Sequence, residues 1–183
     1  MFTIGRAMTV LEADTFEELS FGSKNPLMEK PFGLMLEALD DLKKNEIYIC
    51  SGASPNYALV GELMMTRAKY LGAAGAVANG YSRDTKGLLD MDFPVFSYGN
   101  YAQDQAPRGK VIDFRVPIEM NGVRINPGDI VVGDIDGVCV IPKKHEDEVL
   151  RRAFDKARSE KAVLKAIQQG MGAVEAWRKY QIM

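Results

Sequence analysis

The chain has 183 residues, of which 46% are hydrophobic and 26% charged, a balance typical of one folded globular domain. Its 23 Lys and Arg residues and 25 Asp and Glu residues give a net charge of −2, which disfavours nucleic acid or an anionic membrane surface as a partner. No apolar run approaches the roughly 20 residues of a membrane helix. The opening ten residues lack the pattern of a signal peptide, so we expect a cytoplasmic protein.

One histidine and two cysteines limit the chemistry open to this chain. Cys50 and Cys139 lie in separate apolar stretches, and we expect both thiols to be buried and reduced. His145 lies in the charged run KKHEDE, which predicts an exposed position at the start of a helix. Any catalysis is then expected to depend on carboxylates, arginine and backbone amides, with a hard cation such as Mg²⁺.

The first half of the chain alternates predicted strands and helices. In chain order we expect a strand over 2–13, a loop over 14–30, a helix over 32–44 begun by Pro31, a strand over 47–50, a helix over 57–71, a strand over 75–80 and a turn over 81–84. Gly5 within the first strand indicates a bulge or a close backbone approach. Strand, helix and strand with short connections predict a parallel pair, with Ser51-Gly52 and Arg83-Asp84 at the edge where ligands bind.

The second half is predicted to be antiparallel sheet followed by helix. Strand-like segments cover 95–98, 110–118, 123–125 and 130–141, and Asn121-Gly122 is a strong hairpin signal. A long helix over 144–169 and a short amphipathic helix over 173–180 follow. No internal repeat or linker is present, so we expect a single α/β domain over 1–183.

Two short motifs carry possible chemistry. Gly61-Glu62-Leu63-Met64 lies in or just before a predicted helix, whose free N–H groups can hold a carboxylate or phosphate while Glu62 holds a hydrated cation. The alternative is a solvated Glu62 on an amphipathic helix. In Arg83-Asp84 the arginine suits a carboxylate or enolate oxygen and the aspartate suits Mg²⁺. The alternative there is a polar turn in which Asp84 caps the next helix.

A third acidic motif, Asp134-Ile135-Asp136-Gly137, lacks the ligand spacing of an EF-hand and is interpreted as a turn between two strands. The glycine-rich phosphate-binding motifs and the G-x-S-x-G motif are absent from the sequence. Spacing alone therefore predicts an α/β domain with a candidate carboxylate and arginine site.

Residues 58–84 (ALVGELMMTRAKYLGAAGAVANGYSRD) resemble the family that contains 4-hydroxy-4-methyl-2-oxoglutarate aldolase and the regulator of ribonuclease E activity. The matching positions are Gly61, Glu62, Gly72, Gly75, Val77, Gly80, Arg83 and Asp84. Residues 5–10 and 127–142 are similar to two further blocks of that family, G-x-A-x-T-V and P-G-D-x-x-x-x-D-x-D-G-V. The resemblance thus covers nearly the whole chain.

The resemblance implies an α/β fold of α-β-β-α layers of the swivelling phosphohistidine-domain type, assembled as trimers or hexamers. It also implies a divalent-metal class II aldolase that releases pyruvate from a 4-hydroxy-2-oxo acid, with oxaloacetate decarboxylase activity as a related reaction. By the same resemblance, Asp84 binds Mg²⁺ or Mn²⁺, Glu62 holds a metal-bound water and Arg83 contacts substrate oxygens. The amides of residues 61–64 bind the pyruvyl carboxylate, and Glu160 reaches the site from a neighbouring subunit.

The family also contains non-catalytic regulators that bind a ribonuclease or a helicase through surface contacts, and this is the alternative function. The regulator branch commonly lacks the aspartate of the Arg-Asp pair, so the presence of Asp84 favours the enzyme. Two departures from the family pattern are visible: Asn79 stands where aspartate is frequent, and many members carry a helix before the strand that opens this sequence.

Overall fold

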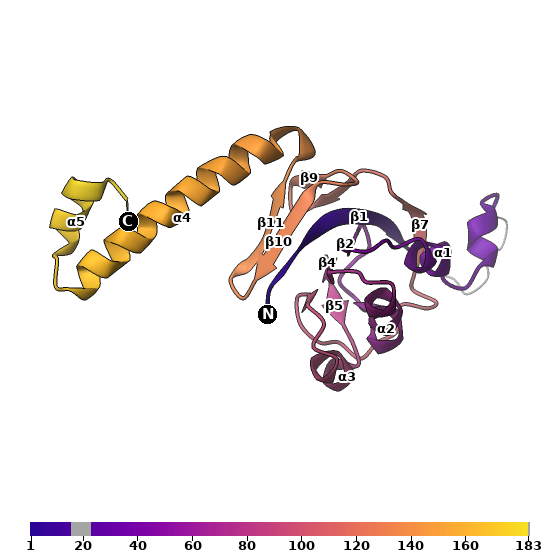
Figure 1. Cartoon of the computed structure of the whole chain (residues 1–183). Coiled ribbons are helices and arrows are strands. Elements are labelled where there is room, and N and C mark those ends of the chain that lie inside the picture. Colours follow the sequence, from indigo (N-terminus) through magenta and orange to yellow (C-terminus); the bar gives the residue numbers. More distant parts are fainter. Residues whose placement is uncertain (16–22, 183) are drawn as a thin grey trace. The chain divides into compact units, whose positions relative to one another are not determined.

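The computed structural model describes residues 1–15 and 23–182, so most of the predicted loop over 14–30 is described and residues 16–22 lie outside. The chain divides into two compact units, Met1–Lys143 and Lys144–Met183. The first unit contains the predicted site residues other than Glu160. Its elements (Figure 1) are β1 Thr3–Asp14, η1 Pro26–Glu29, α1 Met35–Asp40, β2 Glu46–Ser51, β3 Ala58–Val60, α2 Glu62–Tyr70, β4 Gly75–Ala78, β5 Tyr81–Ser82, α3 Thr85–Asp90, β6 Val95–Phe96, β7 Gly109–Phe114, β8 Ile118–Met120, β9 Val123–Ile125, β10 Ile130–Asp134 and β11 Gly137–Ile141.

The main sheet is mixed and curled around the long strand β1. Its order is β11-β10-β1-β2-β4-β6, and β7 pairs with the far end of β1. Strand β2 is parallel to β1 and to β4, and β4 is parallel to β6. Strands β7 and β10 pair with β1 in antiparallel fashion, and β11 pairs with β10 in the same way. The register of β1 against β7 shifts between Leu11 and Glu12, as at a bulge, which increases local twist. The predicted parallel pair, β2 with β4, is confirmed, and so is the antiparallel pairing of β7 to β11. Strand β6, expected among the antiparallel strands, instead pairs with β4 in parallel.

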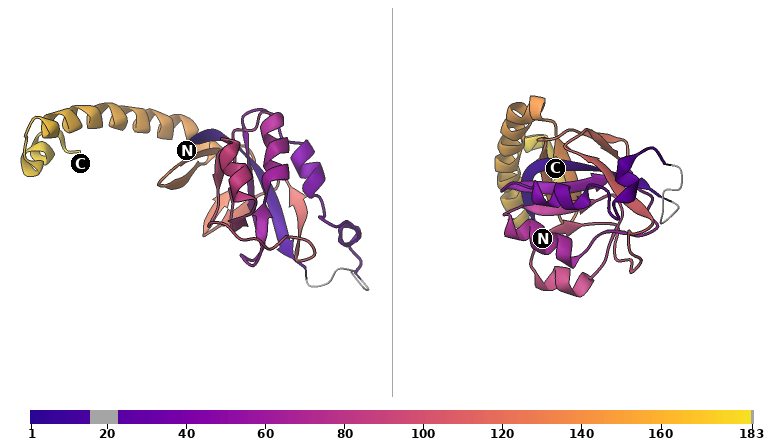
Figure 2. Two further views of the ribbon diagram at one scale, coloured as in Figure 1. Left: turned by 90° about the horizontal axis from the view of Figure 1, so that it is seen from below. Right: turned by 90° about the vertical axis from the view of Figure 1, so that its right-hand side faces the viewer.

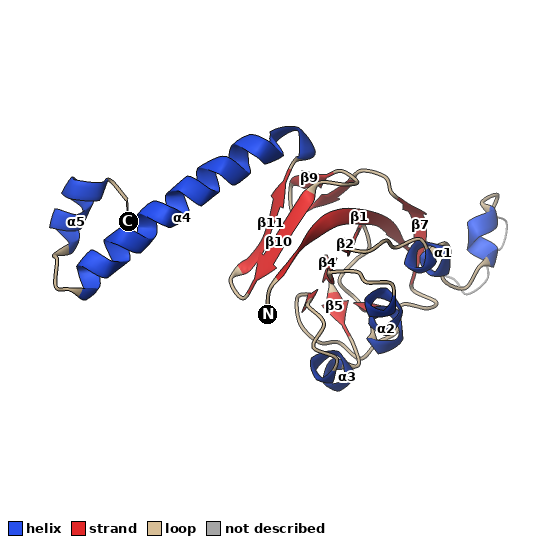
Figure 3. Ribbon diagram, viewed as in Figure 1, coloured by secondary structure: helices blue, strands red, loops and turns tan. Residues whose placement is uncertain are grey.

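Different elements cover the two faces of this sheet. Helices α1, α2 and α3 lie on one face (Figures 1 and 2), where Met35, Met65 and Leu88 pack against buried strand residues such as Met8 and Tyr48. On the other face, Ile118 and Ile125 of the β8–β9 hairpin pack on a second cluster. Figure 3 shows α1, α2 and α3 on one side of the strands and the hairpin strand β9 on the other. The chain is therefore a mixed α/β fold, as predicted.

A separate two-stranded sheet changes the predicted boundaries around the site. Strand β3 pairs with β5 in parallel, so the helix expected over 57–71 begins only at Glu62. Residues 58–60 are all buried, and an apolar run this short fits either a strand or a helix. The turn expected over 81–84 likewise begins as strand β5, which places Arg83-Asp84 beyond this small sheet rather than beyond β4.

Two further expectations are wrong. The helix predicted over 32–44 is confined to Met35–Asp40, so Pro31 lies before it and not within its first turn. The helix ends early because the chain turns at Asp41. Cys139 is exposed, since it lies on β11 at the edge of the sheet, whereas Cys50 is buried as expected. The close approach predicted at Gly5 is confirmed, because a Cβ atom there would lie 2.5 Å from the carbonyl oxygen of Asn45.

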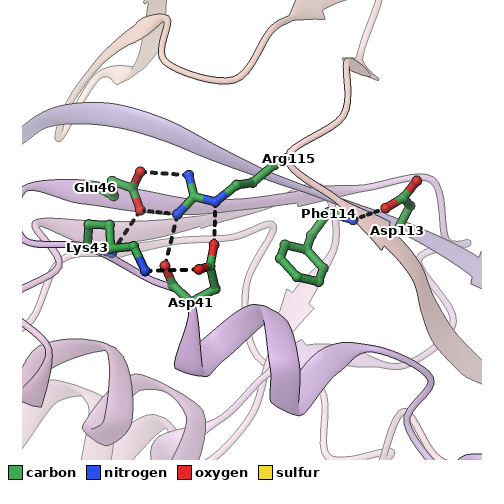
Figure 4. A network of polar contacts seen from close by, with 6 residues as sticks. All are labelled: Asp41, Lys43, Glu46, Asp113, Phe114 and Arg115. Atoms are coloured by element: carbon green, nitrogen blue, oxygen red, sulfur yellow. Dashed lines mark hydrogen bonds and ion pairs between the residues drawn. The ribbon is translucent and has the colours of Figure 1, made fainter.

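A polar network explains why α1 stops and why the strand expected over 110–118 is interrupted (Figure 4). Arg115 has a φ of 56°, which ends the extended conformation between β7 and β8. Its guanidinium donates hydrogen bonds to the carboxylates of Asp41 and Glu46. Lys43 Nζ donates to Asp41 Oδ1 across 2.9 Å. The hydrogen bond from Arg115 holds the pKa of Asp41 below its usual value. These contacts fix residues 41–46 as the connection from α1 to β2.

The second unit consists of α4 Glu146–Gln168 and α5 Ala173–Tyr180, preceded by the short η2 Lys143–His145. Both predicted C-terminal helices are confirmed, and His145 is exposed directly before α4. Glu160 forms an ion pair with Lys156 one turn away, with 3.4 Å between Oε1 and Nζ. Among the described residues, no helix combines the length and apolar character required to span a membrane.

Candidate functional site

Parallel pairing brings the two sequence motifs together. Gly61-Glu62 follows β3 directly and Arg83-Asp84 follows β5, so both motifs leave the same end of the small sheet. The backbone nitrogen of Arg83 donates to the carbonyl oxygen of Val60 across 3.0 Å, which continues this pairing. The predicted site residues of the first unit therefore lie side by side, at the start of α2 and the start of α3.

Asp84 has an unusual backbone and an unexpected partner. Its φ of 59° and ψ of 38° place it in the left-handed region, which costs an ordinary residue roughly 1 kcal/mol. It is the residue before α3, yet its side chain makes no capping hydrogen bond to that helix. Instead, Asp84 Oδ2 accepts from the backbone nitrogen of Glu62 across 3.1 Å. The carboxylate thus caps α2, the helix that carries the neighbouring motif, where the helix dipole also favours negative charge.

Two glycines leave the space that these carboxylates occupy. A Cβ atom on Gly61 would lie 2.8 Å from Asp84 Oδ2 and 3.2 Å from Arg83 Cγ. On Gly87 of α3, a Cβ atom would clash with the carboxylate of Glu62. The glycine of the Gly-Glu motif therefore serves a close approach between motifs, which explains why the pattern needs a residue without a side chain.

Arg83 lies between two carboxylates. Its Nε is 3.8 Å from Asp84 Oδ2, and its Nη1 is 3.4 Å from Asp104 Oδ2. All three side chains are partly open to solvent, so these ion pairs contribute little to stability. The arrangement holds the guanidinium loosely and leaves its donors able to meet an incoming carboxylate or enolate oxygen.

Two adjoining cavities meet at Asp84. One has a volume of about 440 Å³ and is lined by Gly61, Leu63, Met64, Arg83 and Asp84 together with residues of α1 and of the segment around Asp104. The other, also about 440 Å³, is lined by Glu62, Asp84 and the first turns of α3. Volumes of this size accommodate a small organic ligand.

The donor set at Asp84 fits a hard cation better than a zinc ion. Within the described part of the chain, no cluster of three or more His, Cys, Asp or Glu side chains is arranged to hold a metal. Asp84 uses Oδ2 for its contacts with Glu62 and Arg83, which leaves Oδ1 for a cation. Mg²⁺ characteristically takes one or two carboxylates and keeps several waters, and Asp84 and Glu62 line one cavity. Carboxylate oxygens of this kind are compatible with Mg²⁺ or Mn²⁺, and the metal-binding role of Asp84 and Glu62 stays a prediction.

The sequence motifs miss part of this site. Asp104 and Gln105 line the cavity beside Arg83, but they come from the polar segment YAQDQAPRG, which matches no motif. Glu160 belongs to the second unit, so its predicted role stays a prediction. The roles assigned to residues 61–64, Arg83 and Asp84 also stay predictions, although these residues are adjacent.

A buried carboxyl group lies behind the cavity wall. Glu12 is 2% exposed, and its Oε2 accepts from Gln105 Nε2 across 2.9 Å. Burial raises the pKa of Glu12 to about 8, and the nearby Asp14 adds to this effect whereas a hydrogen bond with Cys50 opposes it. Asp14 behaves oppositely: burial would raise its pKa, but hydrogen bonds from Ser54 and Tyr57 lower it. Glu12 therefore holds the segment of Gln105 in place as a neutral acid near pH 7.

Comparisons with known proteins identify relatives by sequence and by fold. A relative from Halalkalibacterium halodurans, named "Putative 4-hydroxy-4-methyl-2-oxoglutarate aldolase", is 38% identical over 68% of this chain and 59% of its own length. The chain thus spans less than two thirds of that relative. An uncharacterized protein from Pseudomonas syringae pv. tomato has the same fold, with a TM-score of 0.83 at 24% identity over 98% of this chain and 77% of the other.

A third structure, Streptomyces coelicolor RraAS2, is described as an unusual member of the RNase ES inhibitor RraA protein family. Its TM-score is 0.73 at 22% identity, over 88% of this chain and 75% of the other, so it supports the fold alone. The model of the RraA-like family, described as Aldolase/RraA, matches residues 1–140, which include both motifs and the cavity they line. This chain belongs to the RraA-like family.

Proposed function

We propose that this protein is a divalent-metal-dependent class II pyruvate aldolase that cleaves a 4-hydroxy-2-oxo acid. The observation that carries the proposal is the junction of Gly61-Glu62 with Arg83-Asp84 at the wall of a cavity of about 440 Å³. Relatives named as aldolases of this kind support it. Mg²⁺ or Mn²⁺ is the proposed cofactor, held by Asp84 directly and by Glu62 through water.

The reaction requires a site that stabilises negative charge. Cleavage of the C3–C4 bond leaves its electron pair on the pyruvate fragment as an enolate, which takes a proton from solvent at C3 to give pyruvate. The C4 hydroxyl gives its proton to solvent and becomes a carbonyl. When bound, the metal ion supplies Lewis-acid stabilisation of developing oxygen charge. Arg83 is proposed to bind the same oxygens and to orient the 2-oxo acid. The free amides at the start of α2, those of Leu63 and Met64, are proposed to bind the carboxylate.

Decarboxylation of oxaloacetate passes through the same pyruvate enolate, so it is proposed as a second activity of this site. We further propose a homo-oligomer, as a trimer or hexamer, to which Glu160 contributes from a neighbouring subunit. An α-β-β-α layered architecture of the swivelling phosphohistidine-domain type, a single functional domain over 1–183 and a cytoplasmic location complete the proposal.

The decisive experiment measures pyruvate release from 4-hydroxy-4-methyl-2-oxoglutarate and from oxaloacetate, with Mg²⁺ and then with EDTA. Metal-dependent release that falls by about 100-fold or more in Arg83→Ala is expected if Arg83 stabilises the transition state. The matched control is Arg124→Ala, which removes an exposed arginine of the β8–β9 hairpin far along the chain from both motifs. Release that is unchanged in Arg83→Ala would contradict the proposed site.

The family description, Aldolase/RraA, also favours a second candidate, a non-catalytic regulator that binds a ribonuclease or a helicase. This candidate requires no metal and no reaction at Asp84. It is favoured if the folded, metal-replete protein releases no pyruvate above background from either substrate. Co-purification with ribonuclease E would then be the next measurement.

A further inference from the structure

The cleavage proposed above needs a group that accepts the proton of the C4 hydroxyl. That proton must leave as the C3–C4 bond breaks, whereas Arg83 and the proposed metal site act on the oxygen that becomes the enolate. The oxygens on C2 and C4 of the substrate are separated by three carbon atoms. The acceptor is therefore expected to line the same cavity as Arg83, within hydrogen-bonding reach of the C4 hydroxyl.

The residues that line this cavity leave few choices for the acceptor. Of the described lining residues, only Asp40, Asp84 and Asp104 carry a carboxylate, and none is His, Lys, Cys or Tyr. Asp84 Oδ2 caps α2, and the proposed function assigns the rest of that carboxylate to the metal. Asp40 Oδ1 accepts from Arg67 Nε across 2.9 Å, a hydrogen bond that joins α1 to α2. Asp104 is the remaining carboxylate.

Asp104 and Asp84 face different nitrogens of one guanidinium. Asp104 Oδ2 is 3.4 Å from Arg83 Nη1, and Asp84 Oδ2 is 3.8 Å from Arg83 Nε. A substrate whose C2 oxygen is held at Arg83 on the side of Asp84 can therefore extend its C4 toward Asp104. The contact of Asp104 with Arg83 is longer than a strong charge-assisted hydrogen bond, and the Asp104 side chain is 48% exposed. This carboxylate is thus able to accept a proton and to pass it to solvent.

The backbone around Asp104 is anchored on both sides of its carboxylate. Gln105 Nε2 donates to Oε2 of the buried Glu12 across 2.9 Å, and Arg108 Nη1 donates to the carbonyl oxygen of Asp104 across 3.1 Å. The backbone nitrogens of Arg108 and Gly109 donate to the carbonyl oxygen of Gln105. These contacts fix the point from which the carboxylate enters the cavity, and a group that acts on a bound substrate requires such a fixed position.

We infer, on the basis of the aldolase function proposed above, that Asp104 is the catalytic base for the C4 hydroxyl. Its carboxylate takes the hydroxyl proton while the C3–C4 bond breaks. The C4 oxygen becomes a carbonyl, and the electron pair of the broken bond stays on the C3 side as the enolate. Asp104 then gives its proton to solvent, and C3 takes one from solvent. Cleavage of 4-hydroxy-4-methyl-2-oxoglutarate in this way yields two molecules of pyruvate, and no oxidant or reductant is required.

The test compares two reactions that pass through the same enolate. Cleavage of 4-hydroxy-4-methyl-2-oxoglutarate requires removal of the C4 hydroxyl proton. Decarboxylation of oxaloacetate does not, because its C4 carboxylate is already ionised and leaves as carbon dioxide. With Mg²⁺ present, we expect Asp104→Asn to lower kcat for the cleavage by about 100-fold or more and to leave kcat for the decarboxylation within about threefold of wild type.

Asp113→Asn is the matched control, because Asp113 is exposed on β7 and lines neither cavity. It is expected to change neither reaction, and thermal unfolding checks that both variants are folded. An equal loss of both reactions in Asp104→Asn, or undiminished cleavage, would overturn the inference and leave the aldolase function standing. The same holds for a selective loss of cleavage in Asp40→Asn in place of Asp104→Asn. A wild-type protein that releases no pyruvate from 4-hydroxy-4-methyl-2-oxoglutarate overturns the aldolase function as well.

Discussion

The carboxylate of Asp84 caps the helix that begins at Glu62, with 3.1 Å between Oδ2 and the backbone nitrogen. The residue that precedes α3 thereby closes the N-terminus of α2. Asp84 consequently has a structural role through Oδ2 and a proposed metal-binding role through Oδ1. Substitutions at this junction can separate the two roles.

Asp84→Asn is the first such substitution. Asparagine tolerates the left-handed backbone and keeps an oxygen for the Glu62 amide, so we expect a change in the free energy of unfolding within about 1 kcal/mol. Loss of the negative charge is expected to lower pyruvate release by at least about 100-fold. Asp92→Asn is the control, because Asp92 has a φ of 49° and lines neither cavity. Full activity of Asp84→Asn would show that the carboxylate charge is dispensable.

Gly61→Ala tests the close approach between the motifs. The added Cβ would lie 2.8 Å from Asp84 Oδ2, so the carboxylate must move and the cap on α2 is lost. We expect activity to fall and the protein to lose about 1 kcal/mol of stability, as for removal of a typical N-cap. Gly172→Ala, before α5, is the matched control, since a Cβ there meets no atom within 4 Å. Equal activity in the two variants would argue against the observed geometry.

Gly87→Ala is expected to separate stability from activity. Alanine within a helix is favoured over glycine by up to about 1 kcal/mol, so α3 becomes more stable once the Glu62 side chain has moved away. That movement displaces the carboxylate proposed to hold the metal-bound water, so the Mg²⁺ concentration for half-maximal activity rises. Titration of pyruvate release with Mg²⁺, together with thermal unfolding, checks both effects. An unchanged Mg²⁺ requirement would exclude this role for Glu62.

Glu12 gives the fold a pH dependence of predictable sign. Burial raises its pKa from 4.5 to about 8 in the folded protein, so between these pH values the folded state holds a proton that the unfolded chain has released. Stability therefore falls as pH rises through this window, by up to about 1.4 kcal/mol per pH unit. Glu12→Gln keeps an acceptor for Gln105 and is expected to remove that slope. Urea unfolding at several pH values checks it.

Exposed Glu29→Gln on η1 is the control for that experiment. The slope of the wild-type protein is expected to persist in Glu29→Gln. If Glu12→Gln retained the full slope, another group would be responsible for the pH dependence.

Local signals in the sequence predict the elements whose structure is decided locally. The Asn121-Gly122 hairpin is confirmed, because both residues adopt the positive φ that this turn requires, 50° and 81°. The helix over 57–71 is wrong at its start, because residues 58–60 pair with β5, some twenty residues later in the chain. Gly61 is at the N-cap position, and it lacks the side-chain oxygen by which a helix start is usually predicted from sequence. Exposure of Cys139 similarly depends on sheet order, which no local pattern contains.

The residues of the candidate site also fall into two groups, those predicted from local motifs and those that depend on tertiary contacts. Gly61, Glu62, Arg83 and Asp84 are all found from short motifs, the first pair at or near the start of a predicted helix and the second pair in the turn after a predicted strand. Asp104 reaches the cavity through a contact with Arg83, and Gln105 through a contact with the buried Glu12, 93 positions earlier, and no local motif predicts either contact. The sequence does not predict that the leucines of α1 line the cavity either. Their helical spacing is the same as that of leucines that pack in a core, and only the folded structure shows which residues lie opposite them.

The pairing of β3 with β5 has a consequence for how the site arises during folding. Glu62 and Asp84 are 22 residues apart, and the strands, helices and turns that position them all lie within residues 58–90. Closing so short a loop costs little chain entropy, and contacts of low sequence separation form early. The proposed catalytic centre is thus a local assembly, whereas the β1–β10 pairing that closes the main sheet joins residues more than a hundred positions apart. The contact between Glu62 and Asp84 is therefore expected to form earlier in folding than the pairing of β1 with β10.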